Sequence, residues 1–254
     1  MVLFENSNTR SKDYSNLIET PRPGHADFTA DKKFGGFQDY RGGGHFSGRL
    51  TLGLVAAGVI AKKIINPANV EAKLLEVGGS ADIDAAVDRA IEAGDSIGGI
   101  VECTIAQVPV AMGEPFFDSV EAVISHLIFS IPAIKGIEFG AGFQAAKMTG
   151  SQHNDNIVSI DGSTETNNAG GINGGITSGN DIVFRVVVKP TSSTHQSQRT
   201  MNMKSGEIEE LTIEGRHDTC IALRVPVVVE AAAAVVMADL MLRAQETDRI
   251  FTQK

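Results

Sequence analysis

The sequence has no tryptophan, two tyrosines and two cysteines among its 254 residues. Cys103 and Cys220 form no close pair and no metal-ligand spacing, so a reduced, cytoplasmic compartment is expected. His153 and Asp155 have no second histidine at a matching spacing, so we expect no metal ion.

Basic residues are also in short supply. The chain holds 22 lysines and arginines against 31 aspartates and glutamates, which gives a net charge of −9. Because nucleic acids are bound by basic surfaces, this balance argues against a nucleic-acid partner. Arginines gathered in glycine-rich loops of an acidic protein favour a small anionic ligand in a local positive pocket.

No stretch of the sequence predicts a secretion signal or a membrane span. Met1–Asn6 has neither a basic region nor an apolar run. The most apolar stretch, Val225–Leu242, is interrupted by Glu230 and Asp239, which predicts a buried helix and no membrane partner.

The overall composition is that of a globular protein. Hydrophobic residues make up 42% of the chain and charged residues 21%. A chain of this length fits a single domain, residues 1–254, that buries roughly three quarters of its unfolded surface.

Against these shortages stand 27 glycines, several of them in a basic stretch from Pro21 to Thr51. This stretch carries three arginines, two histidines and the triplet Gly42–Gly44. Bare backbone can form an anion-binding concavity, and arginine captures phosphate or carboxylate. The residues alone leave a second interpretation equally open, a surface loop whose glycines only make tight turns.

Periodicity predicts the regular elements around this stretch. Helices are expected at Leu52–Ile65, which should be buried with its positive end toward Ser47 and Arg49, at Asp82–Gly94 and at Asp118–Ser130. Strands are expected at Ile100–Val108 and Ile182–Val188, a hairpin at Arg199–Glu214, two short strands within Gly136–Met148 and a flexible loop at Gly150–Gly162.

The strand Ile182–Val188 leads into a second candidate anion site. It is followed by Lys189 and then, after Pro190, by three hydroxyl side chains. One cation and several neutral donors suit a phosphate group, although a hydroxyl-rich turn after a strand needs no ligand.

Five separated motifs resemble those of one family. They are RPGHAD (Arg22–Asp27), DYRGGGHFSGR (Asp39–Arg49), TNNAGGINGGI (Thr166–Ile176), KPTSS (Lys189–Ser193) and GRHDTC (Gly215–Cys220). In this order they are similar to signature segments of chorismate synthases, and the resemblance covers essentially the whole chain.

The resemblance implies an enzyme that uses reduced FMN to convert 5-enolpyruvylshikimate-3-phosphate to chorismate by 1,4-elimination of phosphate. It implies an α+β fold, a β-α-β sandwich of antiparallel sheets layered with central helices. It also implies a homotetramer whose partner is a small phosphorylated carboxylate.

The resemblance assigns roles to individual residues. His25 resembles the histidine that protonates the flavin, and Asp218 the carboxylate that helps a flavin nitrogen take the substrate proton. The implied cofactor contacts are Ser47, Pro132, Ala133, Gly174, Lys189, Pro190, Thr191, Ser192, Ser193 and Arg216. The implied substrate contacts are Arg22, Arg49 and Arg216.

The sequence departs from the family pattern in two places. His45-Phe46-Ser47 stands where many members have Arg-Ser-Ser, so Ser47 alone carries over and the role of His45 is open. The family's N-terminal segment, with a further catalytic histidine and substrate arginines, has no counterpart in these residues. This departure predicts an N-terminally incomplete domain, and it makes a form that binds FMN or phosphate with little turnover the alternative.

Overall fold

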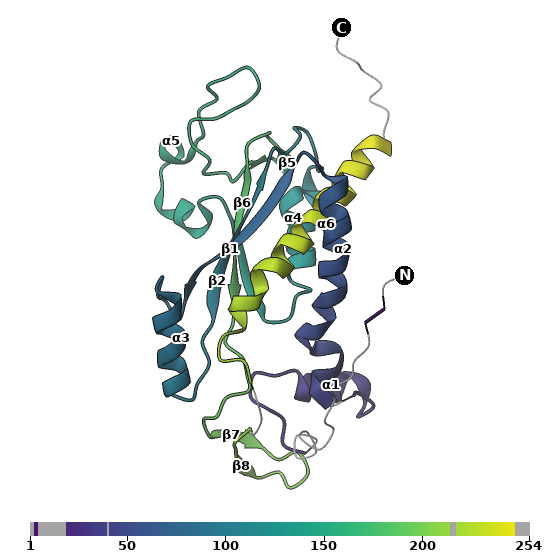
Figure 1. The fold of residues 1–254 in the computed structure, drawn as a ribbon, viewed down its shortest axis with the longest axis vertical. Helices are drawn as coiled ribbons and strands as arrows, with labels where there is room; N and C mark the ends of the chain where they lie inside the picture. Colours follow the sequence, from purple (N-terminus) through teal and green to yellow (C-terminus); the bar gives the residue numbers. More distant parts are fainter. Residues whose placement is uncertain (1–2, 5–18, 40, 214–216, 247–254) are drawn as a thin grey trace.

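We describe the protein from a computed structural model, which covers residues 3–4, 19–39, 41–213 and 217–246 (Figure 1). Its central element is an antiparallel sheet of four strands in the order β1-β2-β6-β3. These strands are β1 (Asn69–Val77), β2 (Gly99–Ala106), β6 (Ile182–Val188) and β3 (Ile134–Phe139). In β2 and β6 every second side chain is buried, because successive residues of a strand point to opposite faces.

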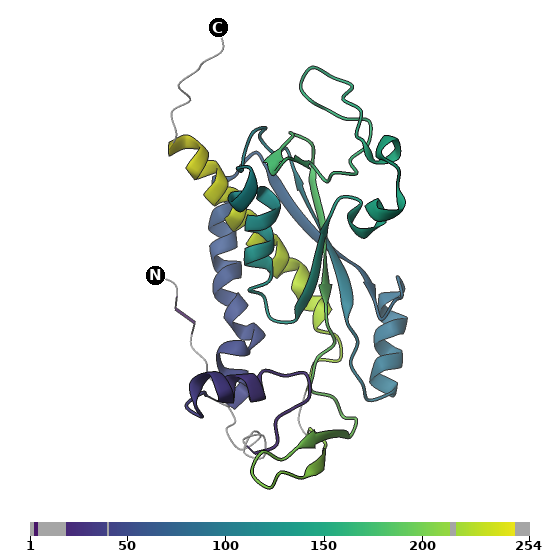
Figure 2. The ribbon, with the colours of Figure 1, turned by 180° about the vertical axis from the view of Figure 1, so that it is seen from behind.

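Three helices cover the buried face of this sheet. Helix α6 (Val225–Glu246) crosses it diagonally, and α2 (Thr51–Ile64) and α4 (Val120–Ile128) pack against α6 (Figures 1 and 2). Val229, Ala233 and Met237 of α6 are fully buried. By length and composition Ile221–Ala244 could cross a membrane, but most of it is buried inside this fold. The prediction of a buried core helix is therefore confirmed.

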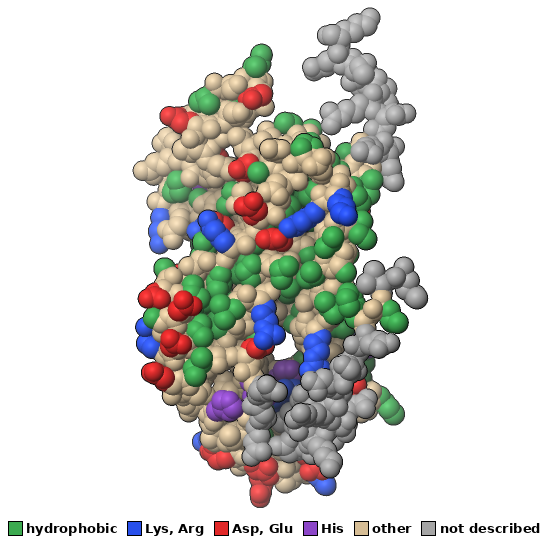
Figure 3. All heavy atoms as spheres, in the orientation of Figure 1, with side chains coloured by type: hydrophobic (Ala, Val, Ile, Leu, Met, Phe, Trp, Pro, Cys, Tyr) green, Lys and Arg blue, Asp and Glu red, His purple; other side chains and the backbone are tan. Residues whose placement is uncertain are grey.

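Helix α2 differs from its prediction as a buried helix. It contacts α6 through a narrow stripe, in which Gly58 and Ala61 are its only buried residues. Val59 and Ile60 are more than half exposed. Figure 3, in the orientation of Figure 1, shows hydrophobic side chains gathered across the middle of the face that it presents. The apolar residues of α2 surround the whole helix, whereas α6 covers only one side of it, so the expectation of full burial was wrong for the described structure.

The two ends of the sheet carry the remaining elements (Figure 1). The lower end holds α1 (Asp27–Phe34), the 3₁₀ helices η2 (Arg41–Phe46), η3 (Gly48–Leu50) and η6 (Ile221–Arg224), and the hairpin of β7 (Gln198–Met201) and β8 (Ile208–Leu211). The upper end holds η4 (Phe116–Asp118), η5 (Gly142–Lys147), α5 (Gly150–His153), β4 (Ile172–Asn173) and β5 (Ile176–Thr177). Helix α3 (Ile83–Glu92) packs beside β1.

Most predicted elements are confirmed to within two residues. This holds for α3, α4, β2 and β6. The predicted hairpin is also present, but its second strand ends at Leu211, three residues before the predicted Glu214, which lies outside the described residues. The second strand expected after Gly140 was wrong: the segment forms η5, where the Glu138 carboxylate accepts a hydrogen bond from the Phe143 amide. The loop expected at Gly150–Gly162 begins instead with α5, which Thr149 and Gln152 cap reciprocally.

Candidate functional site

The site begins where two glycine- and hydroxyl-bearing loops meet at the lower end of the sheet. Lys189 Nζ and Ser192 Oγ both donate to the carbonyl oxygen of Gly24, at 2.8 and 2.7 Å. Lys189 Nζ also donates to Ser192 Oγ at 2.7 Å. The loop that precedes α1 and the loop that follows β6 are therefore one surface.

The strand pairing of β6 determines the position of Lys189. Val188 is paired with Ile134 of β3, and one residue later the Lys189 amide donates to the carbonyl oxygen of Ala133 at 2.9 Å. Ala133 has a φ of 74°, so the turn after Pro132 bends sharply toward Lys189. The structure thus brings both residues of this turn to the loop that follows β6.

This surface carries positive charge. Burial and the nearby charge of Lys135 lower the pKa of Lys189 from its ordinary value. Within the described residues, Lys189 donates hydrogen bonds only to a carbonyl and a hydroxyl oxygen, and no carboxylate neutralises it. An anion bound here would offset the electrostatic repulsion between Lys189 and Lys135.

The loop that follows β6 also contacts the segment before η6. Thr191 Oγ1 donates to the backbone carbonyl of Asp218 at 2.9 Å. The carboxylate of Asp218 is paired with Arg224 at 2.7 Å on the exposed surface. Asp218 therefore borders the loop from Lys189 to Ser193, and Arg216 lies outside the described residues.

On the other side of Gly24, three side chains form a compact cluster. The guanidinium of Arg22 grips the Asp27 carboxylate through Nε at 2.7 Å and Nη2 at 2.8 Å. Nδ1 of His25 lies 2.5 Å from Oδ1 of the same carboxylate. Burial would raise the pKa of Asp27, but the hydrogen bonds from Arg22 and His25 hold it well below its usual range. Asp27 is therefore an anion that accepts from both neighbours.

The side chain of Arg22 is buried and makes its contacts within the protein. This side chain is only 6% exposed, and its Nη1 donates to Ser193 Oγ at 3.3 Å. The guanidinium thereby ties the loop before α1 to the loop after β6. Contact of Arg22 with a substrate stays a prediction, because its donors face Asp27, His25 and Ser193 in this structure.

Ser47 and Arg49 come from η3 and the residue before it, at the same end of the molecule. Ser47 Oγ accepts a hydrogen bond from the Arg49 amide at 3.3 Å and caps η3. The side chain of Arg49 is exposed. Their predicted contacts with cofactor and substrate are compatible with this location and stay predictions.

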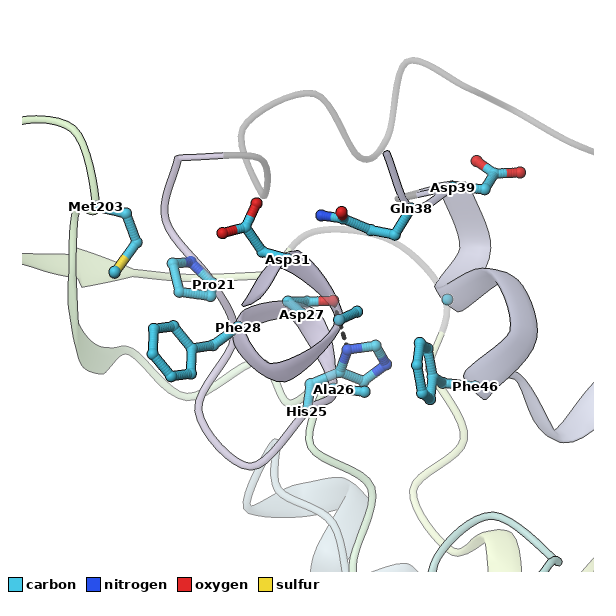
Figure 4. Close-up of a pocket in the computed structure, with 12 residues that line it drawn as sticks. Pro21, His25, Ala26, Asp27, Phe28, Asp31, Gln38, Asp39, Phe46 and Met203 are labelled. Atoms are coloured by element: carbon cyan, nitrogen blue, oxygen red, sulfur yellow. Dashed lines mark hydrogen bonds and ion pairs between the residues drawn. The ribbon is translucent and has the colours of Figure 1, made fainter. Parts of the chain in front are cut away.

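A cavity opens beside His25 (Figure 4). Its volume is about 630 Å³ when the part open to solvent is included. The lining includes Asp27 at the start of α1, Gly43 and Phe46 of η2, and Met203 of the hairpin of β7 and β8. His25 is thus the predicted catalytic residue that faces open space in the described structure.

Gly174 is not brought to this surface. It occupies the β4–β5 hairpin at the upper end of the sheet, where the neighbouring Gly175 carbonyl accepts from the Val120 amide that begins α4. Lys189 follows the opposite end of β6. Within this chain, Gly174 and the loop from Lys189 to Ser193 therefore form separate surfaces.

Two participants were missed by sequence reasoning. The pattern gave Asp27 no role, although a carboxylate two residues after a histidine is a signal for an imidazole partner. The carbonyl of Gly24 has no sequence signal, because any residue carries one. Among the described residues, no group of three His, Cys, Asp or Glu side chains is arranged to hold a metal ion.

The fold and the site together define a class. This is an α+β protein with a sheet packed on central helices. At one end it presents Lys189, which has no carboxylate partner among the described residues, together with hydroxyls and an imidazole–carboxylate pair. The chain belongs to the chorismate synthase family, whose profile matches residues 1–242. Members of this family are carbon–oxygen lyases of aromatic amino acid biosynthesis that act on a small phosphorylated substrate.

Individual relatives agree with this assignment. A chorismate synthase of Chitinophaga pinensis is 64% identical over 251 residues, covering 98% of this chain and 76% of the relative. The chorismate synthases of Dehalococcoides mccartyi and Thermococcus kodakarensis are 44% and 42% identical to this chain, which covers 78% and 76% of their lengths. A chorismate synthase crystal structure matches with a TM-score of 0.69 at 26% identity, over 86% of this chain and 70% of that one. The predicted α+β fold is thereby confirmed.

Proposed function

We propose that this chain binds reduced FMN on the surface formed by Gly24, Ala133 and the loop from Lys189 to Ser193. There it would eliminate phosphate from 5-enolpyruvylshikimate-3-phosphate to give chorismate. The observation that carries the proposal is the convergence of Lys189 and Ser192 on the Gly24 carbonyl. This contact places the segment with His25 directly beside the cation and hydroxyls suited to a phosphate group.

The residues present fit the phosphate end of the cofactor. Lys189 is half-buried, has no carboxylate partner among the described residues, and has its pKa lowered by burial and by the charge of Lys135. Thr191 and Ser192 add neutral hydroxyls; their hydrogens are donated to the carbonyls of Asp218 and Gly24 in this structure, so each would have to rotate to donate to an anion. A phosphate ester is the kind of group that such a set stabilises.

The chain's own residues would hold charges and protons around the bound molecules. When bound, reduced FMN supplies transient electron donation to the reacting allylic system. His25 would hold a proton at Nε2 and give it up toward the cofactor. Asp218 would assist the removal of the ring proton, and Arg49 and Arg216 would bind the two substrate carboxylates. The cytoplasmic location and the homotetramer implied by the family are part of the same proposal.

A second candidate function is binding of FMN or phosphate with little or no turnover. One observation favours it: the carboxylate of Asp218, a predicted catalytic group, is paired with Arg224 in this structure. The chain covers 76% of the Chitinophaga pinensis relative and 70% of the crystallised one. The further histidine and arginines expected from the family have no counterpart in the described residues. Loss of one general acid typically lowers a rate by about 100- to 10,000-fold.

Two anaerobic measurements on the same preparation separate these functions. Titration with reduced FMN measures binding, and phosphate release from 5-enolpyruvylshikimate-3-phosphate measures turnover. Binding together with release supports the first function, whereas binding without release supports the second. If neither occurs, both proposals are rejected, although the family assignment stands.

A further inference from the structure

We propose that Asp27 is a positioning residue for His25: held by Arg22, it fixes a proton on His25 Nδ1, so that Nε2 is the nitrogen that exchanges a proton. The part of this inference that concerns catalysis rests on the proposed function. The part that concerns the imidazole rests on the geometry of these three side chains alone.

The carboxylate of Asp27 has one orientation because two of its neighbours fix it. Arg22 donates from Nε to Oδ2 and from Nη2 to Oδ1, and its backbone amide donates to Oδ2 at 3.1 Å. A bidentate guanidinium pair of this kind fixes both the position and the plane of the carboxylate. The side chains of Arg22 and Asp27 are 6% and 14% exposed, so water competes little for these bonds.

The short contact between Asp27 and His25 determines the position of one proton. Asp27 is ionised, and an ionised carboxylate only accepts hydrogen bonds. His25 Nδ1, at 2.5 Å from Oδ1, must therefore carry the hydrogen. Arg22 Nη2 lies 2.9 Å from Nδ1 and 3.2 Å from Nε2. Because Nδ1 already donates to Asp27, it has no lone pair for this guanidinium. In the neutral ring Nε2 is the nitrogen that can accept from Arg22, which also favours the electron pair on Nε2.

The other ring nitrogen faces the cavity. Gly43 is buried with a φ of 83°, and a Cβ built on it would lie 3.7 Å from His25 Nε2. The backbone of η2 therefore lies along this edge of the imidazole. Figure 4 shows the ring between Asp27 and Phe46, with its second nitrogen directed away from the carboxylate and toward Phe46. His25, Gly43 and Phe46 all line the cavity.

This arrangement determines which proton can move. In the imidazolium both nitrogens carry hydrogen, and Asp27 retains the one on Nδ1. Transfer breaks the N–H bond at Nε2, leaves its electron pair on that nitrogen and passes the proton to an acceptor in the cavity. The neutral ring then keeps its hydrogen on Nδ1 and is ready to accept a proton at Nε2. Asp27 acts through His25 throughout and does not transfer a proton itself.

The test is the position of the proton on neutral His25 in the whole chain labelled with ¹⁵N-histidine. Nitrogen NMR shifts distinguish a protonated ring nitrogen from one with a free electron pair. In the unmodified protein we expect the proton on Nδ1. Finding it on Nε2 overturns the proposal without any variant.

The variant Asp27→Asn tests the cause. Arg22 has only donors, so it would keep the amide oxygen and turn the amide NH₂ toward His25 Nδ1. The proton is then expected to move to Nε2, which reverses the two nitrogen shifts. Asp27→Glu keeps a carboxylate and should retain the original tautomer. If Asp27→Asn folds and its nitrogen shifts equal those of the unmodified protein, Asp27 does not set the tautomer.

Asp31→Asn is the matched control. Asp31 lies one turn further along α1, is 44% exposed and pairs with Lys32 at 3.2 Å. Figure 4 shows its carboxylate directed away from His25. The same chemical change there should leave the nitrogen shifts of His25 as in the unmodified protein. Reversed shifts in this control would refute a specific role for Asp27.

Binding of reduced FMN separates this inference from the proposed function. If the unmodified protein has the proton on Nδ1 but binds no FMN, the proposed function fails while the positioning role stands. If the unmodified protein binds FMN but Asp27→Asn leaves the tautomer of His25 unchanged, the positioning role fails while the binding part of the proposed function stands. Where turnover is measurable, Asp27→Asn should lower kcat on the order of 100-fold with little change in KM. An unchanged kcat would overturn the catalytic part.

Discussion

Lys189 Nζ lies 2.8 Å from the carbonyl oxygen of Gly24, a residue 165 positions earlier in the chain. A lysine that hydrogen-bonds a carbonyl and a hydroxyl keeps its whole charge available, because neither partner is an anion. This contact therefore joins two sequence motifs and also leaves a cation exposed to a ligand.

Lys189→Met should lower the affinity for reduced FMN by about 10- to 100-fold, since hydrogen bonds to charged groups contribute about 1.5–3 kcal/mol. The measurement is an anaerobic titration. Lys147→Met is the control, because Lys147 is exposed on η5 at the opposite end of the molecule. Equal affinities of the two variants would show that Lys189 does not contact the cofactor.

The same variant should lose little stability. The pKa of Lys189 is lowered in the fold, so folding is opposed by its charge at neutral pH, and this opposition fades as the pH rises through the lowered pKa. We expect the free energy of unfolding at neutral pH to change by less than about 0.5 kcal/mol. Urea unfolding at neutral pH measures it. A large loss would mean that the bond to Gly24 is primarily structural.

Asp27→Asn should weaken the fold in a pH-dependent way. The pKa of Asp27 is lowered in the folded state, so its stabilisation is complete above the unfolded value of about 4 and is lost as the pH falls further. Removing one partner of a buried ion pair costs on the order of 3 kcal/mol.

Urea unfolding of Asp27→Asn at pH 7 and at pH 3 measures this contribution. The difference between variant and unmodified protein should be large at pH 7 and smaller at pH 3. A difference that is independent of pH would contradict the assigned ion pair.

Gly58→Ala should destabilise the protein although alanine favours helices. A Cβ at Gly58 would lie 2.4 Å from the Cβ of Ala231, so α2 and α6 would have to move apart. Overpacking of this kind costs about 1–3 kcal/mol. Gly53→Ala, on the same helix with no atom within 4 Å of its new Cβ, should instead stabilise by about 0.5–1 kcal/mol. The melting temperatures of both variants measure these changes in stability. A Gly58→Ala variant more stable than the unmodified protein would refute the close contact of α2 with α6.

Asp155→Asn should loosen the loop that contains Thr166–Ala169. The Asp155 carboxylate accepts hydrogen bonds from Thr166 Oγ1 at 2.6 Å and from the amides of Asn168 and Ala169 at 2.7 and 2.9 Å. Hydrogen bonds to a charged group contribute about 1.5–3 kcal/mol, so exchange of these two amides should accelerate by roughly 10-fold or more. Hydrogen exchange measures it. Asp161→Asn is the control: it lies in the same loop, and among the described residues its carboxylate hydrogen-bonds Ser159 and Ser163 but neither Asn168 nor Ala169, so both amides should stay protected.

The amino-acid pattern was sufficient for most regular elements. Alternation in β2 and β6 and helical spacing in α3 and α4 are local properties, because side chains three or four residues apart share a helix face and alternate ones share a strand face. The motifs around His25 and Lys189 also identified the family. These features need no knowledge of distant contacts.

The tertiary structure alone decided which of these segments meet. Gly24 and Lys189 are brought together, whereas Gly174 lies at the other end of β6. The contacts of Asp27 with His25 and Arg22 depend on how the loop before α1 is folded. Likewise, the apolar sequence of α2 did not reveal that only its side toward α6 is buried in the described structure. Sequence periodicity gives the side a residue points to, but contacts across long sequence separations depend on the packing of the whole chain.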